Sequence, residues 1–260
     1  FVLGPLIGGV LGEFGTRAPF YAAAALAAAN MVFGYFVLPE TVTDRIRRPF
    51  QLQRANPFGA FRHLGKLPGI GRLTVMFFLY QVAFFVYPTI WAYFAEERFG
   101  WEPRMIGLSL AAFGVSIALT QGLLIRPVLA RFGERRTVLI GLGVNMIGFA
   151  AMSVVTSGAV ALALTPITAL GAMAMPALQG IMSRRVPDDS QGELQGLLTS
   201  AGALAMILSP ILMTQTFYLF AAEGARFYLP GAPFLLSLVL ILICVVVFVN
   251  RGTRPDGTGR

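Results

Sequence analysis

The chain has 260 residues, of which 56% are hydrophobic and 12% are charged, and its mean hydropathy is +0.73. A soluble domain carries about 25% charged residues, and a single core of this size could not bury so much apolar surface. The excess must face lipid, which disfavours a soluble enzyme, a nucleic-acid-binding domain and a disordered chain. One Cys and one His leave no disulfide framework and no His/Cys metal cluster, so we expect neither a metal nor a cofactor.

Apolar runs of membrane-spanning length divide the chain. A bilayer core of about 30 Å requires about 20 apolar residues per helix. This length predicts one partial span, Phe1–Gly12, and seven full spans, which are Pro19–Leu38, Leu73–Ala95, Arg104–Ile125, Thr137–Thr156, Ala159–Met182, Leu194–Phe220 and Leu229–Asn250. We expect no signal peptide, and we expect the chain to be a fragment that begins within a span.

The charged residues separate the connections between spans into two sets. One set holds 16 of the 20 Lys and Arg residues and 7 of the 12 acids, and it comprises Pro39–Arg72, Arg126–Arg136, Ser183–Glu193 and Arg251–Arg260. The alternate connections hold the remaining 4 basic and 5 acidic residues. An excess of Lys and Arg in short loops marks the cytoplasmic side. The pI of about 10.4 therefore indicates topology and contact with anionic lipid headgroups, rather than nucleic acid as a partner.

The longest polar segment, residues 39–71, predicts a basic cytoplasmic linker between two helical bundles. About one and a half spans precede it and six follow it. Residues 1–38 are then the remnant of an N-terminal six-helix bundle, residues 72–250 a C-terminal six-helix bundle, and residues 251–260 a cytoplasmic tail. The fold class that this predicts is an all-α membrane protein, with about seven and a half of the twelve helices of a two-bundle transporter.

A run of small residues stands at the beginning of the chain. Gly4, Gly8 and Gly12 recur every four residues, so they share one helix face, which a second helix can approach closely. Pro5 removes a backbone donor and allows a bend, and Gly9 completes a Gly-Gly pair. Generic tight packing is the alternative that the spacing alone leaves open.

This run resembles the fifth-span antiporter motif of exporters of the major facilitator superfamily. Further stretches resemble the tetracycline-resistance exporters of that superfamily, and they are residues 18–24, 38–40, 106–114, 175–179, 183–184 and 191–196. The resemblance implies a multi-pass protein of the bacterial inner (plasma) membrane that exports a drug-like, amphipathic, tetracycline-like molecule by alternating access. It also implies proton antiport, so that the drug, protons and the lipid bilayer are the expected partners.

The connection Arg126–Arg136 resembles the second copy of the superfamily's cytoplasmic loop signature, although Ala130 stands at the acidic position. The matching residues are Arg131, Gly133, Arg135 and Arg136. Gly133 permits a tight turn, and the arginines, Arg126 included, can bind carbonyl groups at helix C-termini and hold a cytoplasmic gate. Positive-inside anchoring is the simpler alternative, and the two are compatible.

Polar and aromatic side chains within the spans are the candidates for a substrate cavity, and they are Gln81, Phe84, Trp91, Gln121, Asn145 and Gln179. The first three share one stripe of a helix, where aromatic surface and an amide would suit a large amphipathic molecule. The alternatives are ordinary helix packing, a membrane-interface position for Trp91 and an amide satisfied between helices for Asn145.

Titratable side chains are missing where proton coupling would need them. The spans after residue 72 hold no Asp, Glu or His well inside, although antiport requires a group whose pKa and exposure differ between states. Where the resemblance implies a His in the eighth span and an acid in the ninth, this chain has Ile117 and Asn145. We therefore expect the coupling residues in a missing first half, or a different substrate.

Three other kinds of membrane protein are alternatives to a drug exporter. A metabolite transporter of the same superfamily, for a sugar or an organic acid, is the main alternative, although an anionic substrate would call for Arg or Lys deep within the spans. A membrane-embedded enzyme needs converging acids, His or a metal site. A channel needs a filter motif. The spans offer none of these features, so we expect a transporter and not an enzyme.

Overall fold

The computed structural model describes residues 11, 17–38, 69–222 and 227–250. The chain divides into two compact units, residues 1–50 and residues 51–260, and the described part of each is helical and contains no strand. In the first unit, helix α2 (Ala18–Val37) is apolar except for Asn30. Its 20 residues rise about 30 Å, which matches the hydrocarbon core of a bilayer.

Several predicted features lie outside the described residues. They are the glycine-rich motif with Gly4, Pro5, Gly8, Gly9 and Gly12, the linker up to residue 68, and the tail 251–260.

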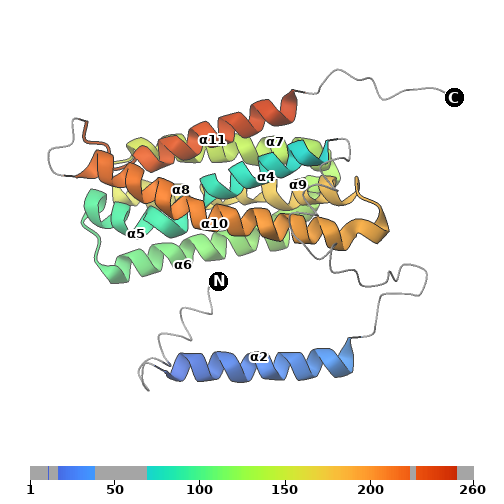
Figure 1. Cartoon of the computed structure of the whole chain (residues 1–260). Coiled ribbons are helices and arrows are strands. Elements are labelled where there is room, and N and C mark those ends of the chain that lie inside the picture. Colours follow the sequence, from blue (N-terminus) through green and yellow to red (C-terminus); the bar gives the residue numbers. More distant parts are fainter. Residues whose placement is uncertain (1–10, 12–16, 39–68, 223–226, 251–260) are drawn as a thin grey trace. The chain divides into compact units, whose positions relative to one another are not determined.

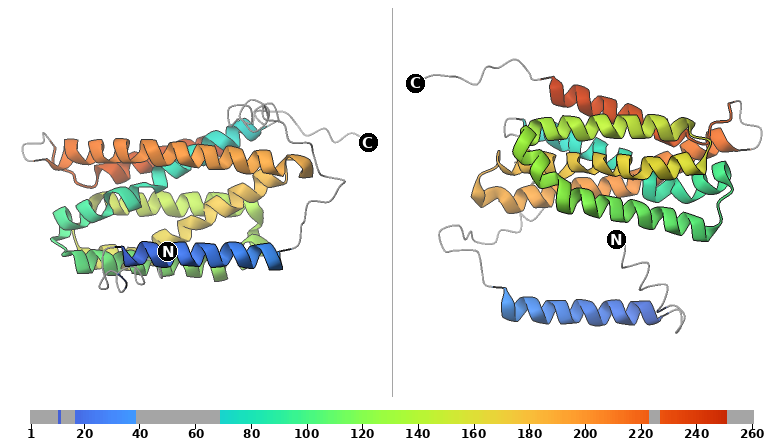
Figure 2. Two further views of the ribbon diagram at one scale, coloured as in Figure 1. Left: turned by 60° about the horizontal axis from the view of Figure 1, so that its bottom comes forward. Right: turned by 180° about the vertical axis from the view of Figure 1, so that it is seen from behind.

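The second unit is a bundle of helices that run side by side (Figures 1 and 2). In chain order its elements are α4 (Ile70–Phe84), α5 (Val86–Phe99), α6 (Pro103–Leu119), the π-helical turn η1 (Thr120–Leu124), α7 (Ile125–Val154), α8 (Gly158–Leu170), the 3₁₀ turn η2 (Gly171–Met173), α9 (Ala174–Ser183), the 3₁₀ turn η3 (Asp188–Ser190), α10 (Gln191–Ala221) and α11 (Ala232–Val249).

Helical runs long and apolar enough to cross a membrane account for most of the described residues. They are Phe20–Val37, Ile70–Phe99, Met105–Val154, Gly158–Ser183, Asp188–Ala221 and Ala232–Val249. Their limits lie within a few residues of the spans expected from hydropathy. The all-α membrane architecture predicted from the sequence is therefore confirmed.

The run Met105–Val154 contains two of the predicted spans. A straight helix of 50 residues would extend about 75 Å, more than twice the thickness of the bilayer core. The chain instead reverses at Gly133, where φ is 72° and ψ is 165°, inside α7 (Figure 2). The predicted spans Arg104–Ile125 and Thr137–Thr156 are thus two antiparallel legs, and Gly133 stands in the tight turn that joins them.

We expect Gly133→Ala to lower the free energy of unfolding by about 1–3 kcal/mol, because its backbone conformation is one that only glycine adopts without strain. No atom lies within 4 Å of the place that a Cβ would take, so the backbone alone would cause the loss. The measurement is thermal unfolding of the purified protein in detergent. Gly107→Ala is the control, because Gly107 also has open space but lies within helix α6. Equal midpoints for the two variants would contradict the prediction.

Apolar and aromatic side chains fill the interior of the bundle. Phe94, Phe149 and Phe234 are fully buried, and Tyr87 packs against the latter two with ring centroids 5.7 Å apart in each case. Large apolar side chains also cover the outer surface, for example Ile207 on α10, with 63% of its area exposed. Because large apolar side chains are exposed on most of the described helices, this outer surface suits lipid as its surroundings.

The arginine-rich connections of the described part meet at one end of the bundle, where α4 begins and α11 ends (Figure 1). There the Arg72 guanidinium donates a hydrogen bond to the carbonyl of Asn250, just beyond α11. At the same end Arg184, after α9, pairs with Glu134 of α7. The cations of these arginine-rich connections thus share one end of the bundle, as the charge pattern predicts.

At the opposite end of the bundle, hydrogen bonds join the connections that do not belong to the arginine-rich set. The Tyr228 hydroxyl donates to Glu97 Oε1 over 2.6 Å, and Arg98 Nε donates to the carbonyl of Val155 over 3.0 Å. The hydrogen bond to the Glu97 carboxylate raises the pKa of the Tyr228 phenol above its ordinary value. A raised pKa means that this bond is present at neutral pH and is lost only as the pH rises through the alkaline range.

Candidate substrate cavity and its supports

A pocket of about 270 Å³ lies between α4 and α10, in their halves nearer the arginine-rich end. Its lining is almost entirely apolar and comprises Gly71, Thr74, Val75, Phe78, Leu197, Ala201 and Leu204. The Thr74 hydroxyl donates to the carbonyl of Ile70 in its own helix, over 3.0 Å. The volume is close to the lower limit for small-molecule sites, about 300 Å³, so the pocket has room for part of a drug-sized molecule.

Gln81 lies one turn beyond Phe78 on α4 and is half-buried. It faces α10, because a Cβ built on Gly202 would lie 3.6 Å from the Gln81 amide nitrogen. The predicted cavity amide is therefore on the side of α4 that also forms the pocket. Its role toward a substrate stays a prediction.

Phe84 is half-buried in an aromatic cluster. Its ring stacks on Tyr80, with centroids 5.8 Å apart and planes 9° apart, and lies 6.3 Å from the ring of Phe113. Tyr87 joins the cluster at 5.7 Å from Phe84. These contacts hold the Phe84 ring from several sides, so it could form a rigid wall and not a mobile one.

Trp91 lies inside the bundle, with 6% of its area exposed. Its indole N–H donates to Ser109 Oγ over 2.8 Å, and its ring lies 6.2 Å from that of Trp101. A belt residue would instead sit at the lipid headgroups. The space that Trp91 lines with Tyr87 and Phe113 is only about 10 Å³, room for at most one water molecule.

Asn145 is buried at a junction of three helical segments, with 2% of its area exposed. Its amide nitrogen lies 3.2 Å from Tyr80 Oη of α4 and 3.1 Å from the carbonyl oxygen of Gly171 in η2. The Tyr80 hydroxyl donates to the same carbonyl over 3.2 Å. These contacts agree with the interpretation of Asn145 as an amide that is satisfied between helices.

The Gly171 carbonyl stands where the span α8–α9 is interrupted. Pro176, five residues later, has no backbone N–H and so cannot donate to Ala172. The helix tightens to 3₁₀ over Gly171–Met173. The Gly171 carbonyl accepts the Ala174 N–H within this turn, and Tyr80 and Asn145 of neighbouring helices bond the same carbonyl at the break.

The other cavity candidates do not converge on the pocket. Gln121, in the π-helical turn η1, and Gln179, on α9, are both exposed. Ile117 is half-buried on α6. Neither amide lines the pocket between α4 and α10, so their assignment to the cavity stays a prediction.

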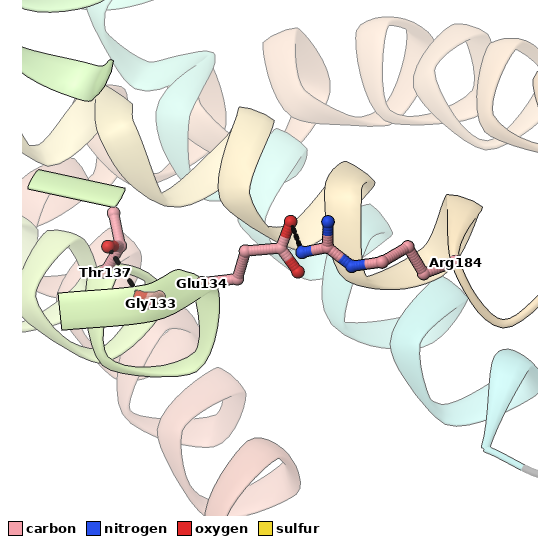
Figure 3. Close-up of polar contacts among 4 residues, drawn as sticks. All are labelled: Gly133, Glu134, Thr137 and Arg184. Atoms are coloured by element: carbon pink, nitrogen blue, oxygen red, sulfur yellow. Dashed lines mark hydrogen bonds and ion pairs between the residues drawn. The ribbon is translucent and has the colours of Figure 1, made fainter. Parts of the chain in front are cut away.

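The expected gate loop lies at the arginine-rich end, where Arg126, Arg131, Arg135 and Arg136 are all exposed. Figure 3 shows two contacts beside them: Glu134 pairs with Arg184, and the Thr137 hydroxyl donates to the carbonyl of Gly133 over 2.8 Å. The ion pair joins α7 to the end of α9. Arg184 is 68% exposed, so the pair contributes little to stability by itself.

Glu134, Arg184 and Tyr80 are not among the site residues predicted from the sequence. For the ion pair, the only available signal was one acid among the arginines of the loop. For Tyr80, the only signal in the sequence was that it is one of several aromatic residues near Gln81 and Phe84. In each case the partner lies far away in the sequence, and only the fold brings the two together.

Among the described residues, no group of three His, Cys, Asp or Glu side chains could hold a metal ion. Long apolar helices, proline-interrupted spans bonded by their neighbours and an apolar pocket between two spans are features of a polytopic helical membrane protein of the transporter kind. The chain belongs to the Major Facilitator Superfamily, whose profile matches residues 73–259.

Curated relatives of the chain include several tetracycline resistance proteins. The chain is 36% identical over 257 residues to the class C protein of Escherichia coli and 34% identical over 259 residues to the class G protein of Vibrio anguillarum. Each alignment covers 99% of this chain and 63% of the relative. The class E protein of Escherichia coli is 34% identical over 215 residues, which cover 81% of this chain and 52% of the relative.

The chain thus spans less than two thirds of the length of these relatives. The superfamily profile, the bacterial relatives and the membrane-spanning helices identify it as a multi-pass protein of the bacterial inner membrane. This agrees with the resemblance described from the sequence.

Proposed function

We propose that this chain works in the export of a drug-like, amphipathic, tetracycline-like small molecule by alternating access, as a transporter and not as an enzyme. The printed names of the relatives support the class of substrate. The structural observation that carries the proposal is the pocket between α4 and α10, with Gln81 one turn away. Its partners would be the drug, protons and the lipid bilayer.

The chemistry of the pocket suits a molecule with a flat apolar body and polar edges. Phe78, Leu197 and Leu204 offer apolar area, and burial of such area contributes about 25 cal/mol per Å². The Gln81 amide can donate and accept a hydrogen bond, which would fix the orientation of the bound molecule. No Arg or Lys lines the pocket, so a sugar acid or other organic anion, the substrate of the main alternative, has no counter-ion there.

Proton antiport is a further part of the proposal. The described spans carry no Asp, Glu or His between their ends, and Ile117 and Asn145 cannot titrate. We place the coupling groups outside the described residues, in a preceding half of the transporter. In the same way, we assign residues 72–250 to a C-terminal six-helix bundle and residues 1–38 to the remnant of an N-terminal one, with the basic linker between them.

We expect Gln81→Ala to raise the KM for tetracycline about three- to tenfold, because one substrate hydrogen bond contributes about 0.5–1.5 kcal/mol. The measurement is proton-driven tetracycline uptake by inverted membrane vesicles that contain the transporter, normalised to the amount of protein. Gln215→Ala is the matched control, since Gln215 is exposed on α10 and lies far from Gln81 along the bundle.

A parallel loss of expression and transport in Gln81→Ala would instead show that Gln81 only packs helices together. Vesicles that accumulate no tetracycline but take up a sugar or an organic acid would favour the metabolite alternative.

A further inference from the structure

The span that carries Gln81 and Phe84 is interrupted immediately after them. Helix α4 ends at Phe84 and α5 begins at Val86, in the middle of the apolar run Ile70–Phe99. Pro88 has no backbone N–H, so the carbonyl of Phe84, four residues earlier, has no α-helical donor. Gln81 and Phe84, which the sequence predicts to line the cavity, therefore lie beside a break in the hydrogen bonding of their own helix.

Two serine hydroxyls from neighbouring helices bond the backbone at this point. Ser209 Oγ of α10 donates to the carbonyl of Val82 over 2.9 Å, and Ser237 Oγ of α11 lies 3.0 Å from the carbonyl of Ala83. Both serines are completely buried. Val82 and Ala83 are the two residues between Gln81 and Phe84, so the hydroxyls bond the same turn that presents the amide and the ring.

The two serines differ in how many acceptors compete for the proton of the hydroxyl group. The hydroxyl of Ser237 has one proton, and it also lies 3.1 Å from the carbonyl of Pro233 in its own helix. For Ser209, the contact in the described part is the bond to Val82. Ser209 is therefore the stronger tie between α4 and its neighbours.

We propose that Ser209, supported by Ser237, is a positioning residue of the substrate site. Its hydroxyl fixes the Val82–Ala83 peptide, and through that peptide it sets the direction of the Gln81 amide and the Phe84 ring. Within a bilayer no water replaces a lost donor, so the turn would loosen if the hydroxyl were removed. This inference rests on the proposed function only for the identity of the substrate.

The first test requires no substrate. Hydrogen exchange of the purified protein in detergent, read by mass spectrometry, should show amides in residues 80–90 exchanging about fivefold faster in Ser209→Ala. Ser237→Ala should give a smaller increase. Ser153→Ala is the matched control, because Ser153 is equally a buried serine, yet its hydroxyl donates to Ala150 within its own helix.

The second test is tetracycline uptake by vesicles. Ser209→Ala should raise the KM about three- to tenfold and leave kcat within about twofold, because the site is misaligned while its side chains are still present. Ser153→Ala should match the unmodified transporter in both parameters.

The outcomes separate the two proposals. Exchange in residues 80–90 that is the same in Ser209→Ala as in Ser153→Ala would overturn the positioning role, whatever the substrate. So would faster exchange accompanied by an unchanged KM for tetracycline. Faster exchange in a protein that transports no tetracycline, with or without the substitution, would leave the backbone role in place and refute the proposed function.

Discussion

Replacing Gly141 by alanine is expected to lower the free energy of unfolding by about 2–3 kcal/mol, because a side chain there would be forced into the backbone of another span. A Cβ at this position would lie 2.7 Å from the backbone nitrogen of Ala174 and 3.0 Å from its Cα. Backbone atoms cannot turn aside as a flexible side chain can, so α7 would have to move away from the interrupted span. Thermal unfolding in detergent measures the loss.

Gly143 offers a control on the same helix. A Cβ at Gly143 would meet nothing within 4 Å, and alanine favours a helix by about 1 kcal/mol over glycine. Gly143→Ala should therefore keep or raise the melting temperature. Similar melting temperatures for the two variants would show that α7 and α9 do not approach each other as closely as described.

Removing the Asn145 amide should also have a large effect on the free energy of unfolding. Asn145→Ala abolishes both of its bonds and leaves buried acceptors without this donor, which costs about 1–3 kcal/mol. Tyr80→Phe should cost less, because Asn145 can still donate to Gly171. The two changes should not add, since Asn145 and Tyr80 share a bond and an acceptor. A double-mutant cycle on the free energy of unfolding should give a coupling energy of about 0.5–1.7 kcal/mol.

A coupling energy near zero would mean that the two residues act independently, and the three-way junction would then have no energetic basis. Thr165→Ala with Tyr80→Phe is a suitable reference cycle. The Thr165 hydroxyl is also buried but donates to Ala161 in its own helix, so this pair should be additive.

Hydropathy was sufficient to predict the spans and their alternation, because each span must supply about 20 apolar residues whatever it packs against. The breaks near Pro88 and before Pro176 were not predicted, because a proline alone does not locate a break: Pro166 and Pro210 lie inside the continuous helices α8 and α10. Gly133 was identified as a turn because glycine tolerates the backbone that a sharp reversal needs.

The partners of these features could not be predicted in the same way. Ser209 is 127 residues from Val82, and Asn145 is 65 residues from Tyr80. The period of a helix shows which residues share a face, but it does not show which other helix covers that face. The pocket between α4 and α10 could not be predicted for this reason. Gln81 lies on the side of α4 that faces α10, and its role in a cavity stays a prediction.

The sharp reversal at Gly133 has a consequence for how the protein enters its membrane. The legs on either side are joined by so short a turn that neither can be threaded independently; they must insert together, as a hairpin. Moving Arg131, Arg135 and Arg136 across the hydrocarbon would cost about 3 kcal/mol for each guanidinium. The arginines therefore favour keeping the turn on the cytoplasmic side, and the tight turn at Gly133 makes that preference common to the two spans that it joins.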